Sequence, residues 1–167
     1  MTDNKQINLM IDVISELSNK NVSYEIIGDG ENYEKLVMQA QKLNLCDKVT
    51  FHGWANDVLP ITKRWHIFAL PSINEDLPVA MLECMAQGIV PIASSVGGII
   101  TLLNKGKNGI LCNSSDKNSF KDAVIKLAEN KELYEKMSEN CIETVKSGFL
   151  IDGAVHKTVA IYKEILA

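Results

Sequence analysis

Short apolar runs alternate with longer segments of helical period along most of the chain, and this alternation restricts the possible folds most strongly. The apolar runs are continuous rather than alternating with polar residues, as is typical of strands covered on both faces. Expected strands span residues 22–27, 48–51, 66–70, 90–93 and 108–112. The pattern indicates βαβ units, so we expect one doubly wound α/β domain over residues 1–167, a parallel sheet with helices on both faces.

Helical spacing of apolar residues predicts helices between the strands and in the whole region after Asp116. The expected helical segments are 6–20, 33–43, 56–64 and 78–87. The last helix carries an apolar stripe made of Val155, Val159, Tyr162 and Leu166. This stripe has two interpretations: it packs on this domain, or it crosses to another domain and is an exposed apolar face.

Composition excludes several classes of function. The 167 residues carry a net charge of −4 with no basic block, which argues against nucleic acid as the main partner. No apolar run approaches the ~18 residues of a membrane-spanning helix, and the polar start lacks the apolar core of a signal peptide. Four cysteines stand far apart, without a CxxC or Cys/His pair, so we expect reduced core cysteines and no zinc site in a cytoplasmic protein.

Ligands of open α/β sheets bind outside the carboxyl ends of the strands. The segments that follow the expected strands are 28–30, 52–56, 71–78 and 94–98, and they contain most of the residues suited to binding. We therefore expect these four loops to form one site.

The segment 71–83 is the most informative of these loops. Pro78 suits the first turn of a helix, and the free amides around it would form a site for phosphate or sugar oxygens. Glu75 and Glu83 would flank the same crevice, where a carboxylate can accept two hydrogen bonds from vicinal hydroxyl groups. Taken alone, the residues leave a second interpretation open, in which both glutamates are surface residues and the helix dipole favours their charge.

Five motifs in order extend the pattern over about residues 5–150: IGDG (27–30), VTFHG (49–53), PSINEDLPVAMLECMAQG (71–88), PIASSVGG (91–98) and NGIL (108–111). The two glutamates are separated by seven residues. Together these motifs resemble the retaining glycosyltransferases of family 4, which have the GT-B fold. The resemblance covers only their C-terminal, donor-binding half. It implies that the N-terminal acceptor domain and the first strand of the donor domain are absent.

The resemblance also implies roles for individual residues. Glu83 would hold the ribose hydroxyls, and Glu75 would contact the donor sugar as a catalytic residue together with Lys5. The segment Asp76, Leu77, Pro78 and Val79 would place its amides near the sugar and phosphates. Three positions depart from the family pattern, where Gln6 and Asp76 replace glycines and Thr101 replaces a glutamate. The carboxylate of Asp76 could repel a diphosphate. Lys5 has a second interpretation as a solvated residue at a disordered terminus.

The glycine turns and one aromatic loop complete the expected donor site. Gly28 and Gly30 would form a tight turn or line the site, although the third glycine of a dinucleotide fingerprint is missing. Trp54, with Asn56, would stack on the nucleobase, or it would plug the edge of the domain. Gly97 and Gly98 would let the backbone approach the donor closely, or would only form a turn.

The resemblance therefore implies the donor half of an enzyme that transfers a sugar from a UDP- or GDP-sugar to a glycan or lipid, as in polysaccharide biosynthesis. Neither a metal nor another cofactor is expected. The partner would be an acceptor domain, in cis or as a separate chain, through which the protein could lie at a membrane surface, and the isolated domain would be inactive. Two alternatives remain: a half-enzyme that needs a separate partner, and a non-catalytic nucleotide-binding or interaction module.

Overall fold

Parallel strands alternate with helices in the structure, a computed structural model that describes residues 1–103, 106–150 and 162. A 3-10 turn, η1 (Asp3–Lys5), precedes α1 (Ile7–Glu16), β1 (Tyr24–Ile27), α2 (Tyr33–Lys42) and β2 (Val49–Gly53). The second part contains α3 (Leu59–Thr62), β3 (Ile67–Leu70), α4 (Val79–Ala86), β4 (Val90–Ser94), α5 (Ile99–Leu102), β5 (Ile110–Cys112), α6 (Lys117–Glu129) and α7 (Lys131–Gly148). All five expected strands are present, whereas α5 and η1 were not predicted.

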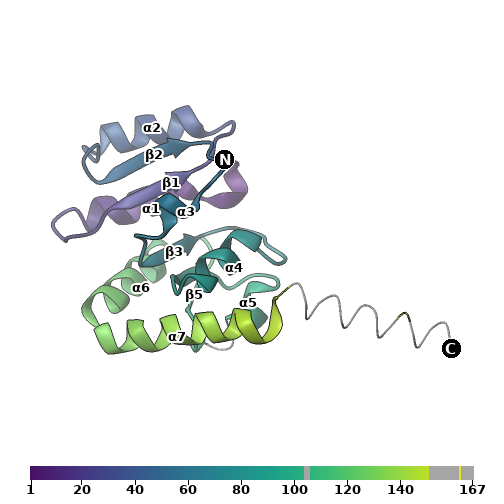
Figure 1. The fold of residues 1–167 in the computed structure, drawn as a ribbon. Helices are drawn as coiled ribbons and strands as arrows, with labels where there is room; N and C mark the ends of the chain where they lie inside the picture. Colours follow the sequence, from purple (N-terminus) through teal and green to yellow (C-terminus); the bar gives the residue numbers. More distant parts are fainter. Residues whose placement is uncertain (104–105, 151–161, 163–167) are drawn as a thin grey trace.

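Helices cover both faces of the sheet, as the continuous apolar strands predicted (Figure 1). Alternate residues of β3 show this directly. Ile67 and Ala69 pack into the core formed with α1 and α6, whereas Phe68 and Leu70 pack into the core formed with α4, α5 and α7. A third core joins α1 and α2 to β1 and β2. The expected doubly wound α/β class is confirmed.

The sheet is interrupted at its centre. β1 pairs in parallel with β2, and β3, β4 and β5 form a second parallel sheet in that order. Successive connections lead outward from the interruption, from β1 to β2 on one side and from β3 through β4 to β5 on the other (Figure 1). This is the arrangement of a doubly wound sheet around its topological switch point. The chain begins beside the carboxyl ends of β1 and β2.

Three of the four cysteines, Cys84, Cys112 and Cys141, are buried free thiols, as predicted, whereas Cys46 is exposed. No helix within the described residues is both long and apolar enough to cross a membrane. Of the C-terminal stripe, Val155, Val159 and Leu166 lie outside the described residues, and Tyr162 is an exposed helical residue.

Candidate functional site

Two loops at the carboxyl edge of the sheet are joined by the side chain of Asn4 in η1. Its amide nitrogen donates to the carbonyl of Asn74 at 3.0 Å, and its amide oxygen accepts from the backbone N–H of Asn74 at 3.1 Å. The carbonyl of Asn4 accepts from the N–H of Ile73 at 2.8 Å. These contacts fix the loop between β3 and α4 relative to the start of the chain.

This clamp brings together Lys5 and Glu75, the two residues for which the resemblance implies a catalytic role. The ammonium of Lys5 forms an ion pair with Oε1 of Glu75, and the hydroxyl of Ser72 donates to the same oxygen at 2.8 Å. The Glu75 side chain is only 12% exposed, and that of Lys5 is 42% exposed. Lys5 therefore lies at the end of η1 beside Glu75, with its side chain still partly exposed to solvent.

The start of α4 lies beside this pair. Pro78 is the N-cap, with φ −74° and ψ 107°, and the helix begins at Val79, one residue later than predicted. The amides of Asp76, Leu77 and Val79 donate to no acceptor within the described residues. Of these three residues only Val79 belongs to α4, and an oxygen-rich ligand could accept from its amide at the positive end of the helix dipole. The side chains of Asp76, Leu77 and Val79 are exposed.

Glu83 stands in the second turn of α4, as predicted, and its side chain is exposed. Glu83 is eight positions after Glu75 in the sequence. Among the described residues, no hydrogen bond joins the two side chains. Glu83 also lines the cavity between the two sheets, as do Lys5 and Gly28. The two glutamates therefore differ in environment: Glu75 is half-buried and held by two partners, whereas Glu83 is free to meet a ligand.

The turn after β4 is built against the backbone of the Glu75 loop. A Cβ added to Gly97 would lie 1.8 Å from the carbonyl oxygen of Glu75, and one added to Gly98 would lie 2.1 Å from that of Asp76. Gly97 also has a positive φ of 49°. A side chain at either position would push the loop outward, so this pair of glycines serves a close approach between two loops of the site.

The carboxyl ends of β1 and β2 present bare backbone to the same edge. Gly28 and Gly53 both have positive φ, and the N–H of Gly28 donates to the carbonyl of Gly53 at 2.6 Å. A Cβ at either position would meet open space. Gly30, in contrast, lies against the backbone of Met1, where a Cβ would clash. Gly28 can thus be approached by a ligand, whereas Gly30 is required for packing of the N-terminus.

Trp54 follows β2 and is 72% exposed. Its indole N–H donates to Oδ1 of Asn56 at 3.1 Å, which joins the two residues singled out in this loop. The exposed ring does not plug the domain edge within the described part of the chain. It offers a flat apolar surface on which a planar group could stack.

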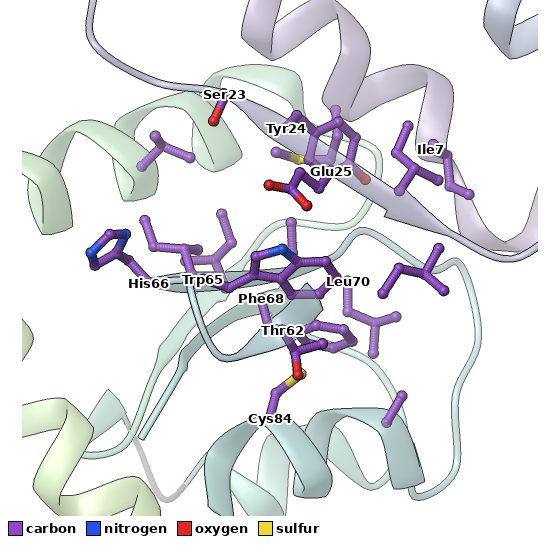
Figure 2. Close-up of a pocket in the computed structure, with 18 of the residues that line it drawn as sticks. Ile7, Ser23, Tyr24, Glu25, Thr62, Trp65, His66, Phe68, Leu70 and Cys84 are labelled. Atoms are coloured by element: carbon purple, nitrogen blue, oxygen red, sulfur yellow. The ribbon is translucent and has the colours of Figure 1, made fainter. Parts of the chain in front are cut away.

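A cavity of about 1150 Å³ separates β1 from β3 and reaches the carboxyl edge (Figure 2). Glu25 of β1 extends into it, and there it pairs with Arg64 through two hydrogen bonds of 2.9 and 2.7 Å and with His52 at 2.8 Å. The hydrogen bonds from Arg64, followed by that from His52, lower the pKa of Glu25 to about 2. This residue is therefore a fixed charge of the structure and not a general acid near neutral pH.

The buried Cys84 thiol, which lines the cavity, is not ionised near neutral pH. Burial, with the charge of Glu83 as a smaller cause, raises the pKa of the Cys84 thiol to about 12, which keeps it from acting as a nucleophile. Across residues 1–103, 106–150 and 162, no three His, Cys, Asp or Glu side chains are grouped as metal ligands would be.

Sequence reasoning did not assign a role to Ser72 or Asn4. Asn4 acts across a long separation in the sequence, since it holds a loop 70 residues away, whereas Ser72 supports Glu75 from three residues before it. Ser72 directly follows Pro71 after β3 and lies in the motif 71–88, in which only the two glutamates were assigned a function. Neither spacing nor composition distinguishes Asn4 from an ordinary surface residue.

Comparisons with known proteins agree with this geometry. Residues 1–144 match the family model described as Glycosyl transferases group 1. The chain is 33% identical over 144 residues to an Escherichia coli UDP-Gal:alpha-D-GlcNAc-diphosphoundecaprenol alpha-1,3-galactosyltransferase, covering 86% of this chain and 37% of that protein. It is 29% identical over 141 residues to N-acetyl-alpha-D-glucosaminyl L-malate synthase of Bacillus anthracis, covering 84% and 37%. The chain thus spans little more than a third of the length of these relatives.

Solved structures share the fold at lower sequence identity. Anabaena HepE, determined in complex with UDP, superposes with a TM-score of 0.91 at 19% identity, covering 98% of this chain and 46% of that chain. Sucrose-phosphate synthase of Thermosynechococcus elongatus superposes with a TM-score of 0.88 at 20% identity, covering 99% and 43%. The neighbours are GT-B glycosyltransferases, so the expected Rossmann-like half of a GT-B fold is confirmed.

Proposed function

Because the chain belongs to the family Glycosyl transferases group 1, we propose that it forms the donor-binding half of a retaining glycosyltransferase. The donor is a UDP- or GDP-sugar, and the acceptor is a glycan or lipid bound by a separate N-terminal domain. The ion pair between Lys5 and Glu75 at the start of α4 carries the proposal, since it places a cation and a carboxylate beside free helix amides. The HepE structure with bound UDP and the named galactosyltransferase support a nucleotide-sugar donor.

Each group has a task in sugar transfer. The bond between the anomeric carbon and the diphosphate oxygen breaks, and the acceptor oxygen bonds to that carbon while its proton passes to the departing diphosphate. Lys5 and the amides of Leu77 and Val79 stabilise the negative charge that grows on the departing diphosphate. The donor phosphate competes with Glu75 for the ammonium of Lys5. Glu75 then accepts hydrogen bonds from the sugar hydroxyls. Neither step requires a metal or a cofactor from this chain.

The nucleoside would lie across the ends of β1, β2 and α4. Glu83 is exposed and has two free carboxylate oxygens, which suits the vicinal hydroxyls of ribose. Gly28 and Gly53 leave space above the backbone, and Trp54 with Asn56 offers a surface for the base. The exposed Leu77 and Val79 beside this site favour a second domain that closes over the donor. That domain would supply the acceptor and any contact with a membrane.

Calorimetric titration of the chain with UDP, GDP, ADP and UMP tests the proposal. We expect saturable binding of one diphosphate. Glu83→Gln should weaken this binding roughly tenfold, because it removes one hydrogen bond to a charged group. The same substitution should not change the binding of the 2′,3′-dideoxy nucleotide, which has no hydroxyls for Glu83 to hold. Glu139→Gln, at an exposed position in the middle of α7, is the matched control.

Three results would contradict the proposal. If Glu83→Gln binds each of the four nucleotides as tightly as the wild-type protein does, Glu83 does not contact the ribose. Equal sensitivity of the dideoxy analogue would make the effect of Glu83 indirect. A third result is that no nucleotide binds to the chain, either alone or combined with an acceptor domain from a relative. This result would favour the non-catalytic module, in which the negative charge of Asp76 repels a diphosphate.

A further inference from the structure

Three residues other than glycine have a left-handed backbone within the described part of the chain. They are Gln6 with φ 44°, Asn44 with φ 55° and Ser115 with φ 60°. This conformation is unfavourable for a residue with a Cβ, whereas glycine adopts it readily. Asn44 is explained by its place, since it follows α2 at a position where asparagine is the usual alternative to glycine. Gln6 and Ser115 are not residue types that favour this conformation.

Gln6 and Ser115 contact each other, although they are 109 positions apart. The hydroxyl of Ser115 donates to Oε1 of Gln6 at 3.0 Å. Gln6 is the last residue before α1, and Ser115 lies in the loop between β5 and α6. A glycine would follow either backbone path with less strain, so two unfavourable residues meet at one contact. Strain of this kind is concentrated at functional sites, which directs attention to what the contact holds.

The contact holds one side of Lys5. Asn4, on the other side, is bonded to the loop between β3 and α4. Gln6 is bonded to the loop between β5 and α6 through Ser115. Lys5 therefore lies between two neighbours that are anchored to different loops. A lysine side chain has many rotamers, and fixing its backbone from both sides limits the region that the ammonium reaches to the surroundings of Glu75.

The loop that carries Ser115 is itself held in place. Asp116 is the N-cap of α6, and its carboxylate accepts from the amides of Asn118 and Ser119 at 3.0 and 3.4 Å. The hydroxyl of Ser119 accepts from the N–H of Asn113 at 3.0 Å. The helix α6 in turn packs on α1 through a shared apolar core. Ser115 is therefore a fixed point from which one hydrogen bond can position the end of η1.

We propose that Gln6 and Ser115 are positioning residues, which hold Lys5 where its ammonium meets the donor diphosphate. The inference rests on the proposed function, because that function assigns phosphate binding to Lys5. Neither residue needs to touch the donor, since the effect passes through the backbone of η1. The hydrogen bond is exposed and contributes little to global stability, so its effect belongs in phosphate binding and in the local order of η1.

Calorimetric titration of UDP, GDP, UMP and GMP into the full chain tests the pair. Ser115→Ala keeps the Cβ and the backbone strain but removes the hydroxyl. We expect it to weaken diphosphate binding about 3- to 10-fold, the effect of one neutral hydrogen bond, and to leave monophosphate binding nearly unchanged. Ser115→Asn retains a donor and is compatible with a left-handed backbone, so it should preserve diphosphate affinity.

Gln6→Gly separates positioning from folding. It relieves the left-handed strain while removing the side chain, so the variant should be as stable as the wild type or more stable, yet bind the diphosphate less tightly. Asn44→Gly is the matched control, because it makes the same backbone change at the end of α2. This control should preserve or raise stability and leave every nucleotide affinity unchanged. A purely structural role for Gln6 would move stability and binding in the same direction.

A double-mutant cycle tests whether the pair acts through Lys5. In a Lys5→Ala background, Ser115→Ala should cause no further loss of diphosphate affinity, because the ammonium that the pair positions is already absent. Additive losses would mean that Ser115 acts on the donor independently of Lys5, and they would overturn the proposal.

Hydrogen exchange measures the positioning without a ligand. The amides of Lys5 and Gln6 are hydrogen-bonded within this turn, to Thr2 and Asp3. We expect Ser115→Ala to speed exchange at these two amides at least about threefold and to leave the amides of β4 unchanged. Unchanged exchange at both amides would show that η1 is held without the hydrogen bond, which would overturn the proposal.

The proposed function and this inference fail in different ways. The proposed function fails if the wild-type protein binds no diphosphate. The positioning role fails if the wild-type protein binds a diphosphate and both Gln6→Gly and Ser115→Ala bind it as tightly.

Discussion

The ammonium of Lys5 contacts the carboxylate of Glu75, a residue that lies 70 positions further along the chain and on the opposite side of the central gap. Asn4, the residue before Lys5, holds the loop before α4 against the first turn of the chain. One ion pair thus links the start of the chain to the candidate site.

Lys5→Ala should weaken diphosphate binding about 10- to 100-fold, because a hydrogen bond to a charged group contributes ~1.5–3 kcal/mol. The loss for UMP should be much smaller, since the proposed donor site brings the ammonium to the second phosphate, which UMP lacks. Titration of UDP and UMP into the variant measures the difference. Lys136→Ala, exposed on α7, is the control, and an equal loss for both nucleotides would contradict the assignment.

Trp54→Ala should weaken UDP and UMP equally, by roughly 5- to 100-fold, because stacking of a base on an aromatic ring contributes ~1–3 kcal/mol. Stability should change by less than ~0.5 kcal/mol, since the side chain is 72% exposed. Titrations with UDP and UMP separate base stacking by Trp54 from phosphate binding by Lys5, because only Lys5→Ala should affect the two nucleotides differently. Unchanged affinity for both nucleotides would show that Trp54 does not contact the base.

Gly97→Ala should lower the free energy of unfolding by roughly 1–3 kcal/mol and also weaken nucleotide binding, because the new Cβ collides with the carbonyl of Glu75. Urea unfolding followed by circular dichroism measures the first effect. The matched control is Gly148→Ala at the end of α7, where a Cβ meets nothing within 4 Å and alanine is neutral or stabilising by up to ~1 kcal/mol. Equal stability of the two variants would refute the close approach.

Stability should fall as the pH is lowered from about 5 toward 2, and Glu25 should contribute to the fall. The pKa of Glu25 in the folded protein is about 2, below the ordinary value of 4.5. Its stabilising effect is therefore complete above pH 4.5 and is lost as the pH falls toward 2. Glu25→Gln should be less stable at pH 7 and should show a shallower acid dependence. Parallel profiles for the wild type and the variant, measured by urea unfolding, would contradict the assignment.

The order of elements was predictable from local patterns. The apolar runs that became β3, β4 and β5 have no polar alternation, and this property favours helices on both faces, whereas β1 and β2 also contain polar residues such as Glu25 and Thr50. Glu83 could be placed in the second turn of α4 because Pro78 marks the start of that helix. The helix α5, only four residues long, was missed because so short a segment has no detectable period.

The sequence by itself determined the α/β class, the four loops that meet at the carboxyl edge and the spacing of Glu75 and Glu83, since these follow from periodicity and from the parallel direction of the strands. Only the tertiary structure decided that Lys5 meets Glu75 and that Gly97 and Gly98 abut the Glu75 loop. The physical reason is range: periodicity reflects neighbours within a few residues, whereas these contacts join segments far apart in the chain through packing and hydrogen bonds that no local pattern encodes.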